Sequence, residues 1–413
     1  MTLGVVVGKF LPPHRGHSYL IESAQQGCDE VLVIVCARSD DLIPAPLRAG
    51  MLRELHPGAT VVVSPDDIPD DRGDDTSRAW AQRTRELSSA CSGRSADLVY
   101  SSEAYGPRYA HFLGARHVSV DPDRVRFPVS GTAVRRDPWG QAEFLAPCVR
   151  AWFVSRIVVL GAESTGTTTL CQDLSVHYGC PWVPEYGRTY CERRPGPIRW
   201  RPADFIHIAA GQQTDEDAAA RACGPLLICD TDALATSVWH ERYLGHRSAA
   251  VERLAADRRY ALHILTADDI PFVQDGTRDG EHIRGWMTQR LREVLAASGR
   301  GWLEVRGSRA ERLDAAVRAI DALGPPQYAR IQYARRRRPR GGRRHRAMNS
   351  AHGFAPQASR IALRRPRCRS ACRDRSVRPS QPWRCRAATG CTSRCCPTSR
   401  RTATRCASTG SCC

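Results

Sequence analysis

The chain has 413 residues and a formal net charge of +18, a basic balance that taken alone is typical of nucleic-acid-binding proteins. The charge is uneven: residues 326 to 413 hold 23 arginines and one acid, Asp374, so they carry +22 and leave −4 for residues 1 to 325. No apolar stretch approaches the ~20 residues that a membrane-spanning helix needs, so a membrane protein is excluded.

Nothing at the start of the chain resembles a signal peptide. The apolar run from Leu3 to Val7 is too short, and Gly8 and Lys9 follow it at once. The cysteines before residue 326 are scattered without metal-ligand spacing, as expected for small core residues of a reduced protein. We therefore expect a cytoplasmic protein. The sequence does not determine its oligomeric state, and a homo-oligomer is possible.

Short β-branched runs alternate with helical stretches along residues 1 to 325, which is typical of βαβ units and parallel sheets. Strands are expected at 3–7, 30–36, 60–63, 97–100, 156–160, 225–229, 261–265 and 302–305, and helices at 18–26, 141–149 and 309–323. Because the pattern starts afresh after a helix-like stretch, we predict two α/β domains, residues 1–150 and 151–325.

The remaining segment, residues 326–413, has too few large apolar residues to bury a core, so we predict a disordered basic tail. Its mixture of Arg, Ser, Thr, Ala, Pro and Cys is what read-through of a G+C-rich frame yields, and we favour such an accidental extension over nucleic-acid binding. Cys391, Cys395 and Cys396 lack the paired spacing of a zinc site.

The loop after the first expected strand carries the strongest motif of the chain. It contains Gly8, Lys9 (the only lysine), Phe10, Pro12, His14, Gly16 and His17. Glycines there permit close approach of a phosphate to the backbone, and the helix that follows directs its N–H groups at the anion. Two imidazoles three residues apart can donate hydrogen bonds to a transferring phosphorus. This pattern is the nucleotidyltransferase signature.

A second cluster, Ser130-Gly131-Thr132 followed by Arg135, precedes another expected helix. Alone it could be a capped helix start. Together with the histidine loop, its hydroxyls, amides and guanidinium suit the β- and γ-phosphates of ATP. The pair predicts in-line attack on the α-phosphate with pyrophosphate leaving, catalysed mainly by positioning and electrostatics, with His14, His17 and Arg135 in catalytic roles.

The strand at 156–160 is followed by a P-loop pattern, G-x-x-x-x-G-x-[ST]. Its expected ATP-binding residues are Gly161, Ser164, Thr165, Gly166, Thr167, Thr168 and Thr169. Thr167 stands where such loops place a lysine that bridges the β- and γ-phosphates, which weakens the argument for phosphoryl transfer. A glycine-containing turn without phosphate is the alternative. Thr168 is the expected Mg²⁺ ligand.

Further residues follow in the order of P-loop kinases. Glu185, Tyr186 and Arg188 lie where such kinases bind the acceptor. Asp230 and Asp232 end an apolar strand, the place of a metal-binding carboxylate, although charges at strand ends are often only solvated. Arg278 lies on a glycine-flanked, lid-like loop and could supply the charge missing at Thr167.

With both motif sets in this order, the chain resembles the bifunctional nicotinamide-nucleotide adenylyltransferase / ribosylnicotinamide kinase family of NAD salvage, over about residues 3 to 325. The resemblance implies a Rossmann-like nucleotidyltransferase domain and a P-loop kinase-like domain. The expected substrates are ATP, nicotinamide mononucleotide and nicotinamide riboside, with Mg²⁺ as the cofactor that accompanies ATP. It also implies that Trp80, Glu103 and Tyr105 hold the nucleotide, and Glu185 and Arg188 the riboside. Some members carry an amino-terminal helix-turn-helix; none is expected here, because the first strand begins at Leu3.

Three alternatives stay open at this point. The chain could be an adenylyltransferase whose P-loop domain only senses ATP, because Thr167 replaces lysine. It could be another transferase of the same superfamily, acting on a different phosphate acceptor. It could also be an NAD- or ATP-responsive regulator that binds nucleic acid through its tail, which we consider the least favoured.

Overall fold

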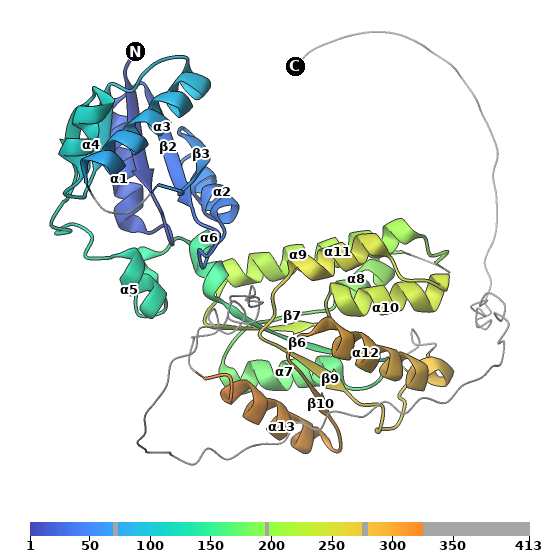
Figure 1. Ribbon diagram of the computed structural model, residues 1–413. Coiled ribbons are helices and arrows are strands. Elements are labelled where there is room, and N and C mark those ends of the chain that lie inside the picture. The colour runs from blue at the N-terminus through green and yellow to red at the C-terminus, as the bar shows by residue number, and fades with distance from the viewer. Residues whose placement is uncertain (69–72, 195–197, 275–279, 325–413) are drawn as a thin grey trace, which may run out of the picture. The chain divides into compact units, whose positions relative to one another are not determined.

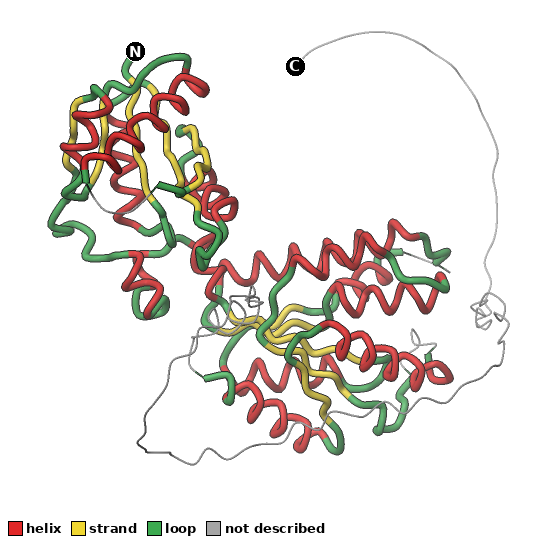
Figure 2. The backbone as a smooth tube through the Cα atoms, in the orientation of Figure 1, coloured by secondary structure: helices red, strands yellow, loops and turns green. Residues whose placement is uncertain are grey.

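The computed structural model describes residues 1–68, 73–194, 198–274 and 280–324, and these residues form two parallel five-stranded sheets (Figures 1 and 2). Arg278 and the predicted tail, residues 326–413, lie outside the described residues. The α/β class with parallel sheets is confirmed.

The first sheet has the strand order β3-β2-β1-β4-β5, and every neighbouring pair is parallel. Its elements are β1 (Leu3–Gly8), α1 (Arg15–Gly27), β2 (Glu30–Ala37), α2 (Ala45–Leu55), β3 (Thr60–Pro65), α3 (Asp74–Ser92), β4 (Leu98–Ser101), α4 (Gly106–Leu113) and β5 (Arg116–Ser119). The four strands expected before residue 101 are present within two residues of their predicted ends, whereas β5 was not predicted.

Alternate residues of β2 pack against different helices, which cover the two faces of the first sheet. Val31, Val33 and Val35 pack in one core with α1 and α2, while Leu32 and Ile34 pack in another with α3 and α4. Successive side chains of a strand point to opposite faces, so a strand covered on both faces is apolar throughout.

The helix expected at 141–149 is wrong. The chain instead forms a series of short helices: α5 (Gly131–Arg136), η1 (Ala142–Phe144), α6 (Pro147–Arg150) and η2 (Ala151–Phe153). Ala146 is extended, with φ −65° and ψ 154°, because the ring of Pro147 disfavours helical backbone at the preceding residue.

The second sheet has the order β10-β9-β6-β8-β7 and is also parallel. Its elements are β6 (Ser155–Gly161), α7 (Thr167–Tyr178), β7 (Trp182–Val183), α8 (Tyr186–Glu192), α9 (Pro202–Ala222), β8 (Leu226–Asp230), α10 (Ala233–Leu244), α11 (Ala249–Asp257), β9 (Leu262–Thr266), η3 (Glu281–Ile283), α12 (Arg284–Ser298), β10 (Trp302–Val305) and α13 (Arg309–Asp321). The strands and the closing helix expected here are present within two residues of their predicted ends.

The two faces of the second sheet are covered by different helices, as Figure 1 shows. Ile157 and Val159 of β6 pack with α7 and α13, while Val158 and Leu160 pack with α9, α10, α11 and α12. The carboxyl ends of β6 and β8 are left side by side, with Val159 opposite Asp230.

Among the described residues, no helix is both long and apolar enough to cross a bilayer.

A buried carboxyl group on α9 makes the stability of the second α/β unit depend on pH. The side chain of Glu216 is fully buried and accepts hydrogen bonds from the Tyr260 hydroxyl at 3.1 and 3.0 Å. Burial raises the pKa of Glu216 to about 7, against the opposing charge of Arg156. The folded state therefore holds a proton that the unfolded chain releases near its ordinary carboxyl pKa.

We predict that the contribution of Glu216 to folding stability falls as the pH rises from about 4.5 to about 7, because its carboxyl binds the extra proton in the folded state throughout that window. Glu216→Gln should remove this loss and stabilise the protein at about pH 8, by on the order of 3 kcal/mol at ~1.4 kcal/mol per pKa unit. Urea unfolding of both proteins at about pH 4.5 and about pH 8 measures the effect. If the free energy of unfolding depends on pH equally in Glu216→Gln and in the wild type, the prediction is contradicted. The exposed Glu86→Gln is the control and should behave like the wild type.

Candidate active sites

The first candidate site lies where the order of strands in the first sheet changes direction. β1 and β4 are neighbours, yet β1 leads to β2 on one side and β4 leads to β5 on the other. In open parallel sheets, ligands bind in the crevice outside the carboxyl ends of two such strands. The histidine loop after Gly8 and the Ser101–Gly106 loop after β4 lie at these ends.

The two histidines of the motif lie against each other at the start of α1. His14 is the N-cap residue, and its ring stacks on that of His17 with 3.7 Å between the ring centroids. The Phe10 ring lies edge-on to His17 at 5.0 Å. The loop and the helix start thus bring both imidazoles to one place.

Both imidazoles are neutral at physiological pH. Burial, followed by the charge of Arg124, lowers the pKa of His14 to about 4, and burial with the neighbouring His14 holds the pKa of His17 well below its ordinary value. The Nδ1 atoms of both rings are buried without a hydrogen-bond partner. Unpaired buried polar atoms are costly, and a bound phosphate would give them partners.

Tight backbone packing fixes the histidine loop. Phe10 is buried and has φ 45°, a left-handed conformation that costs free energy for a residue with a side chain. A Cβ atom on Gly16 would lie 3.2 Å from His14 Nδ1, so glycine leaves room for the stacked ring. Gly8, where a Cβ would lie 3.3 Å from the Phe10 ring, has the same function for Phe10.

The only lysine lies at the edge of this loop. Lys9 Nζ is 4.0 Å from Asp66 Oδ2, and Arg38 Nε donates to the same oxygen at 2.7 Å. The lysine is about half exposed, whereas the Asp66 carboxylate is almost fully buried. Lys9 and Arg38 therefore place two cationic side chains at the carboxyl ends of β1 and β2.

Arg48 of α2 holds the backbone of the histidine loop and was not predicted. Its fully buried guanidinium donates to the Lys9 carbonyl, to the Cys36 carbonyl at 3.1 Å and to the Ile43 carbonyl at 2.8 Å, and it pairs with Asp41. A signal was present in the sequence, because Arg48 lies on the helix stripe of Ala45, Ala49 and Leu52.

The second cluster is tied directly to the histidine loop. Ser130 caps α5 by accepting a hydrogen bond from the Ala133 amide at 3.1 Å. Arg135 donates to the Leu11 carbonyl and, at 3.0 Å, to the Thr132 hydroxyl. A Cβ on Gly131 would lie 2.7 Å from the Leu11 oxygen, so only glycine permits this approach.

The loop after β4 borders the same crevice. The Tyr105 hydroxyl is 3.5 Å from the Val7 carbonyl, and Glu103 accepts from Arg124 at 3.0 Å. Arg124 was not predicted, although its charge acts on both histidines. Trp80, on α3, is half-buried against the core that contains Val5 and Ile34.

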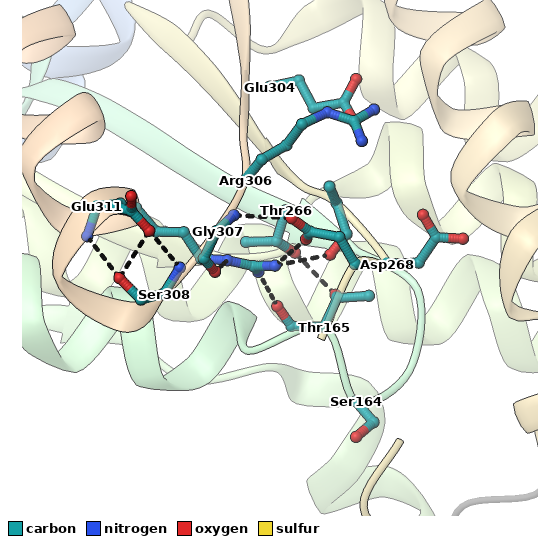
Figure 3. A network of polar contacts seen from close by, with 12 residues as sticks. Ser164, Thr165, Thr266, Asp268, Glu304, Arg306, Gly307, Ser308 and Glu311 are labelled. Atoms are coloured by element: carbon teal, nitrogen blue, oxygen red, sulfur yellow. Dashed lines mark hydrogen bonds and ion pairs between the residues drawn. The ribbon is translucent and has the colours of Figure 1, made fainter. Parts of the chain in front are cut away.

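The second candidate site is the loop between β6 and α7. Ser164 and Gly166 have positive φ, 58° and 83°, and turned backbone of this kind directs amides toward an anion. The Thr165 hydroxyl donates to the Ala162 carbonyl at 2.7 Å and lies 2.7 Å from the Thr266 hydroxyl, so it closes the loop against β9 (Figure 3). Thr169, in the first turn of α7, is exposed.

A hydroxyl and a carboxylate meet beside this loop. Thr168 Oγ1 donates to the Oδ2 atom of the buried Asp230 carboxylate at 2.6 Å. Burial raises the pKa of Asp230. Among the described residues, no group of three or more His, Cys, Asp or Glu side chains could hold a metal ion. The Thr168–Asp230 oxygens nevertheless fit Mg²⁺ that arrives with a nucleotide, since this ion takes most of its ligands from phosphates and water.

Two of the residues predicted to bind the acceptor, Glu185 and Arg188, act electrostatically on the same carboxylate. Burial, then the neighbouring charge of Asp230, raises the pKa of Glu185 to about 7, while Arg188 opposes this effect. The Tyr186 amide donates to Gln212 Oε1 at 2.8 Å, and its hydroxyl lies 3.2 Å from His207 Nε2. The start of α8 therefore brings Glu185 and Arg188 near Asp230, while Tyr186 contacts Gln212 and His207 of α9.

The model of the AAA domain family matches residues 156–312. The Trifunctional NAD biosynthesis/regulator protein NadR of Escherichia coli (strain K12) is 30% identical over 67% of this chain and 72% of its own length. The chain belongs to the NadR family.

Other relatives agree with this membership. NadR of Salmonella typhimurium is 28% identical over the same shares of the two chains. A crystal structure of NadR protein in complex with NR aligns with TM-score 0.61 at 22% identity, covering 78% of this chain and 96% of that one. A second, of NadR protein in complex with NAD and AMP-PNP, aligns with TM-score 0.58. The chain thus belongs to a family of NAD biosynthesis proteins and contains a P-loop kinase-like domain.

One residue predicted as a metal ligand has other partners in this NadR family chain. Asp232 is fully buried, accepts from the Ala235 amide at 2.9 Å as the N-cap of α10, and lies 3.1 Å from His263 Nε2. Both carboxylate oxygens are therefore occupied inside the fold. The metal-ligand prediction for Asp232 is not supported, because the chain turns into α10 directly after Asp230.

We predict that Gly131→Ala destabilises the protein by about 1–3 kcal/mol, the usual cost of overpacking, because the new Cβ would contact the Leu11 oxygen. Gly50→Ala in α2 is the matched control, since a Cβ there has no neighbour within 4 Å, and it should be neutral or stabilising. Urea unfolding measures both. Equal stability of the two variants would show that the histidine loop and α5 are not closely packed.

Proposed function

We propose that this NadR family chain makes NAD in two steps, with one reaction at each candidate site. The second site phosphorylates nicotinamide riboside with ATP, and the first joins the resulting nicotinamide mononucleotide to the adenylyl group of a second ATP. The observation that carries the proposal is that one chain holds the stacked His14–His17 pair at one sheet and the Thr168–Asp230–Glu185 group at the other.

In the first reaction, a phosphate oxygen of the mononucleotide attacks the α-phosphorus of ATP. The bond between the α-phosphorus and the bridging oxygen breaks, and pyrophosphate leaves. In this proposal His14 and His17 donate hydrogen bonds to the phosphate oxygens as their charge is redistributed, and their unpaired ring nitrogens support this role. Arg135, with the start of α5, holds the leaving phosphates.

In the second reaction, the 5′-hydroxyl of the riboside attacks the γ-phosphorus of ATP and ADP leaves. Glu185 is suited to take the hydroxyl proton, because a base is most effective when its pKa lies near the working pH. Thr168 and Asp230 would hold Mg²⁺, which would neutralise part of the phosphate charge. Tyr186 and Arg188 form the acceptor side, and the role of Arg278 stays a prediction.

The rival assignment for the second site is an ATP sensor without transfer, which the substitution at Thr167 favours. Incubation with ATP, Mg²⁺ and nicotinamide riboside separates the two, since only a kinase forms the mononucleotide. The regulator hypothesis rests on residues 326–413, outside the described part of the chain.

We predict that His14→Ala and His17→Ala each lower kcat for NAD formation from the mononucleotide by about 10²-fold or more, as loss of a preorganised donor does. The exposed His111→Ala, on α4, is the control. Phosphorylation of the riboside should be unchanged in all three variants. Near-normal NAD formation in both loop variants would reject the assignment.

Glu185→Gln should lower riboside phosphorylation by about 10²- to 10⁴-fold, the range for loss of a general base. In the wild type, the rate should rise with pH through about 7, because only the deprotonated carboxylate accepts the proton. Glu192→Gln, on the same helix, is the control and should retain activity. A flat pH profile in the wild type, with an active Glu185→Gln variant, would exclude Glu185 as the base.

A further inference from the structure

The P-loop of this chain has lost its lysine, yet two buried arginines contact its backbone. Arg312 Nη1, from α13, donates to the Thr165 carbonyl at 2.7 Å, and Arg284 Nη2, from α12, donates to the Ser164 carbonyl at 3.0 Å. Their exposed fractions are 4% and 8%. Two consecutive carbonyls of the loop are therefore bound by guanidinium groups.

These contacts determine where the loop amides point. In a trans peptide the carbonyl and the N–H group point in opposite directions. Because the arginines hold the Ser164 and Thr165 carbonyls, the amides of Thr165 and Gly166 point away from the arginines. The positive φ of Ser164 and Gly166 is the conformation in which successive amides form an anion-binding concavity.

The guanidinium charges also polarise these peptide groups. A cation at the carbonyl end of a peptide draws electron density toward the oxygen and leaves the N–H more positive, so hydrogen bonds in a chain strengthen one another. Burial keeps water from screening the effect. The two arginines can thus act on a phosphate through the peptide dipoles, without touching it.

The surroundings fix both guanidinium groups in place. Arg312 also donates to the Gly307 carbonyl at 2.9 Å and to the Ala267 carbonyl at 3.2 Å, and it pairs with Asp269. Arg284 lies over the Phe272 ring, and its Nε is buried without a hydrogen-bond partner. Arg284 therefore has spare donor capacity at the loop.

The residue at the lysine position cannot supply the charge itself. Thr167 begins α7 directly after the loop, and its side chain carries no positive charge. Among the described residues, Arg284 and Arg312 are the guanidinium groups with a hydrogen bond to the backbone of residues 164 and 165.

We propose that Arg284 and Arg312 replace the P-loop lysine by acting as positioning residues, which orient and polarise the Thr165 and Gly166 amides toward the terminal phosphates of ATP. The inference rests on the proposed function of the second site, and it names how that site binds a nucleoside triphosphate without lysine.

The test measures whether the two arginines and the lysine position are coupled. The full chain is titrated with AMP-PNP and Mg²⁺ in a calorimeter, with saturating NAD present to occupy the first site. The variants are Arg284→Met and Arg312→Met, each with and without Thr167→Lys. Arg290→Met and Arg309→Met, on the same two helices and paired with Glu241 and Asp173, are the matched controls.

We expect each methionine variant to weaken AMP-PNP binding by about 10- to 100-fold, as for loss of a charged hydrogen bond, and the controls to change it less than twofold. Adding Thr167→Lys to a methionine variant should tighten its AMP-PNP binding by at least tenfold. A merely structural role of the arginines predicts no such recovery. An equal loss of affinity with and without Thr167→Lys would therefore overturn the proposal. Wild-type protein that binds no AMP-PNP would also overturn it.

Two further outcomes keep the inference separate from the proposed function. If the methionine variants do not fold, Arg284→Lys and Arg312→Lys should show a smaller loss with the same recovery, and a loss that Thr167→Lys leaves unchanged would overturn the proposal. If Thr167→Lys recovers AMP-PNP binding in the arginine variants but the wild type phosphorylates no riboside, the inference stands and the kinase assignment fails.

Discussion

Both candidate sites depend on the same constraint: a phosphate-binding loop must turn its amides toward the anion, so its carbonyls need partners on the other side. In this chain arginines are those partners. Arg48 and Arg135 bind the Lys9 and Leu11 carbonyls of the histidine loop, and Arg284 and Arg312 bind the Ser164 and Thr165 carbonyls of the P-loop. The backbone of each loop is thus held in place by the fold itself, which lowers the entropic cost of binding a nucleotide.

This arrangement explains how two unrelated loops can work in one NAD biosynthesis protein. The first loop presents neutral histidines beside a cationic edge, which suits charge growing on a transferring phosphorus. The second presents amides, hydroxyls and one buried carboxylate, which suits a nucleotide bound with Mg²⁺. The proposed product of the second reaction is the substrate of the first, so the two sites form a sequence of reactions.

The sequence predicted the parts of this structure that follow from local patterns. Apolar runs placed the strands, and the glycine and histidine spacings placed both loops. Of the four arginine partners only Arg135 was predicted, because the chain has only one lysine among 61 basic residues, so an arginine carries little information. Arg48, Arg284 and Arg312 do lie on the buried stripes of α2, α12 and α13, which was the available signal. Asp230 and Asp232 could not be separated, because their roles depend on where β8 ends and α10 begins.

The central claim is that one chain carries both reactions, and a single incubation tests it most directly. The full chain is given ATP and Mg²⁺ with nicotinamide riboside as the sole pyridine substrate, and the products are identified by mass spectrometry. The account predicts NAD, with nicotinamide mononucleotide as an intermediate and with both ADP and pyrophosphate released. Recovery of unchanged riboside, in protein that does convert the mononucleotide to NAD, would contradict it.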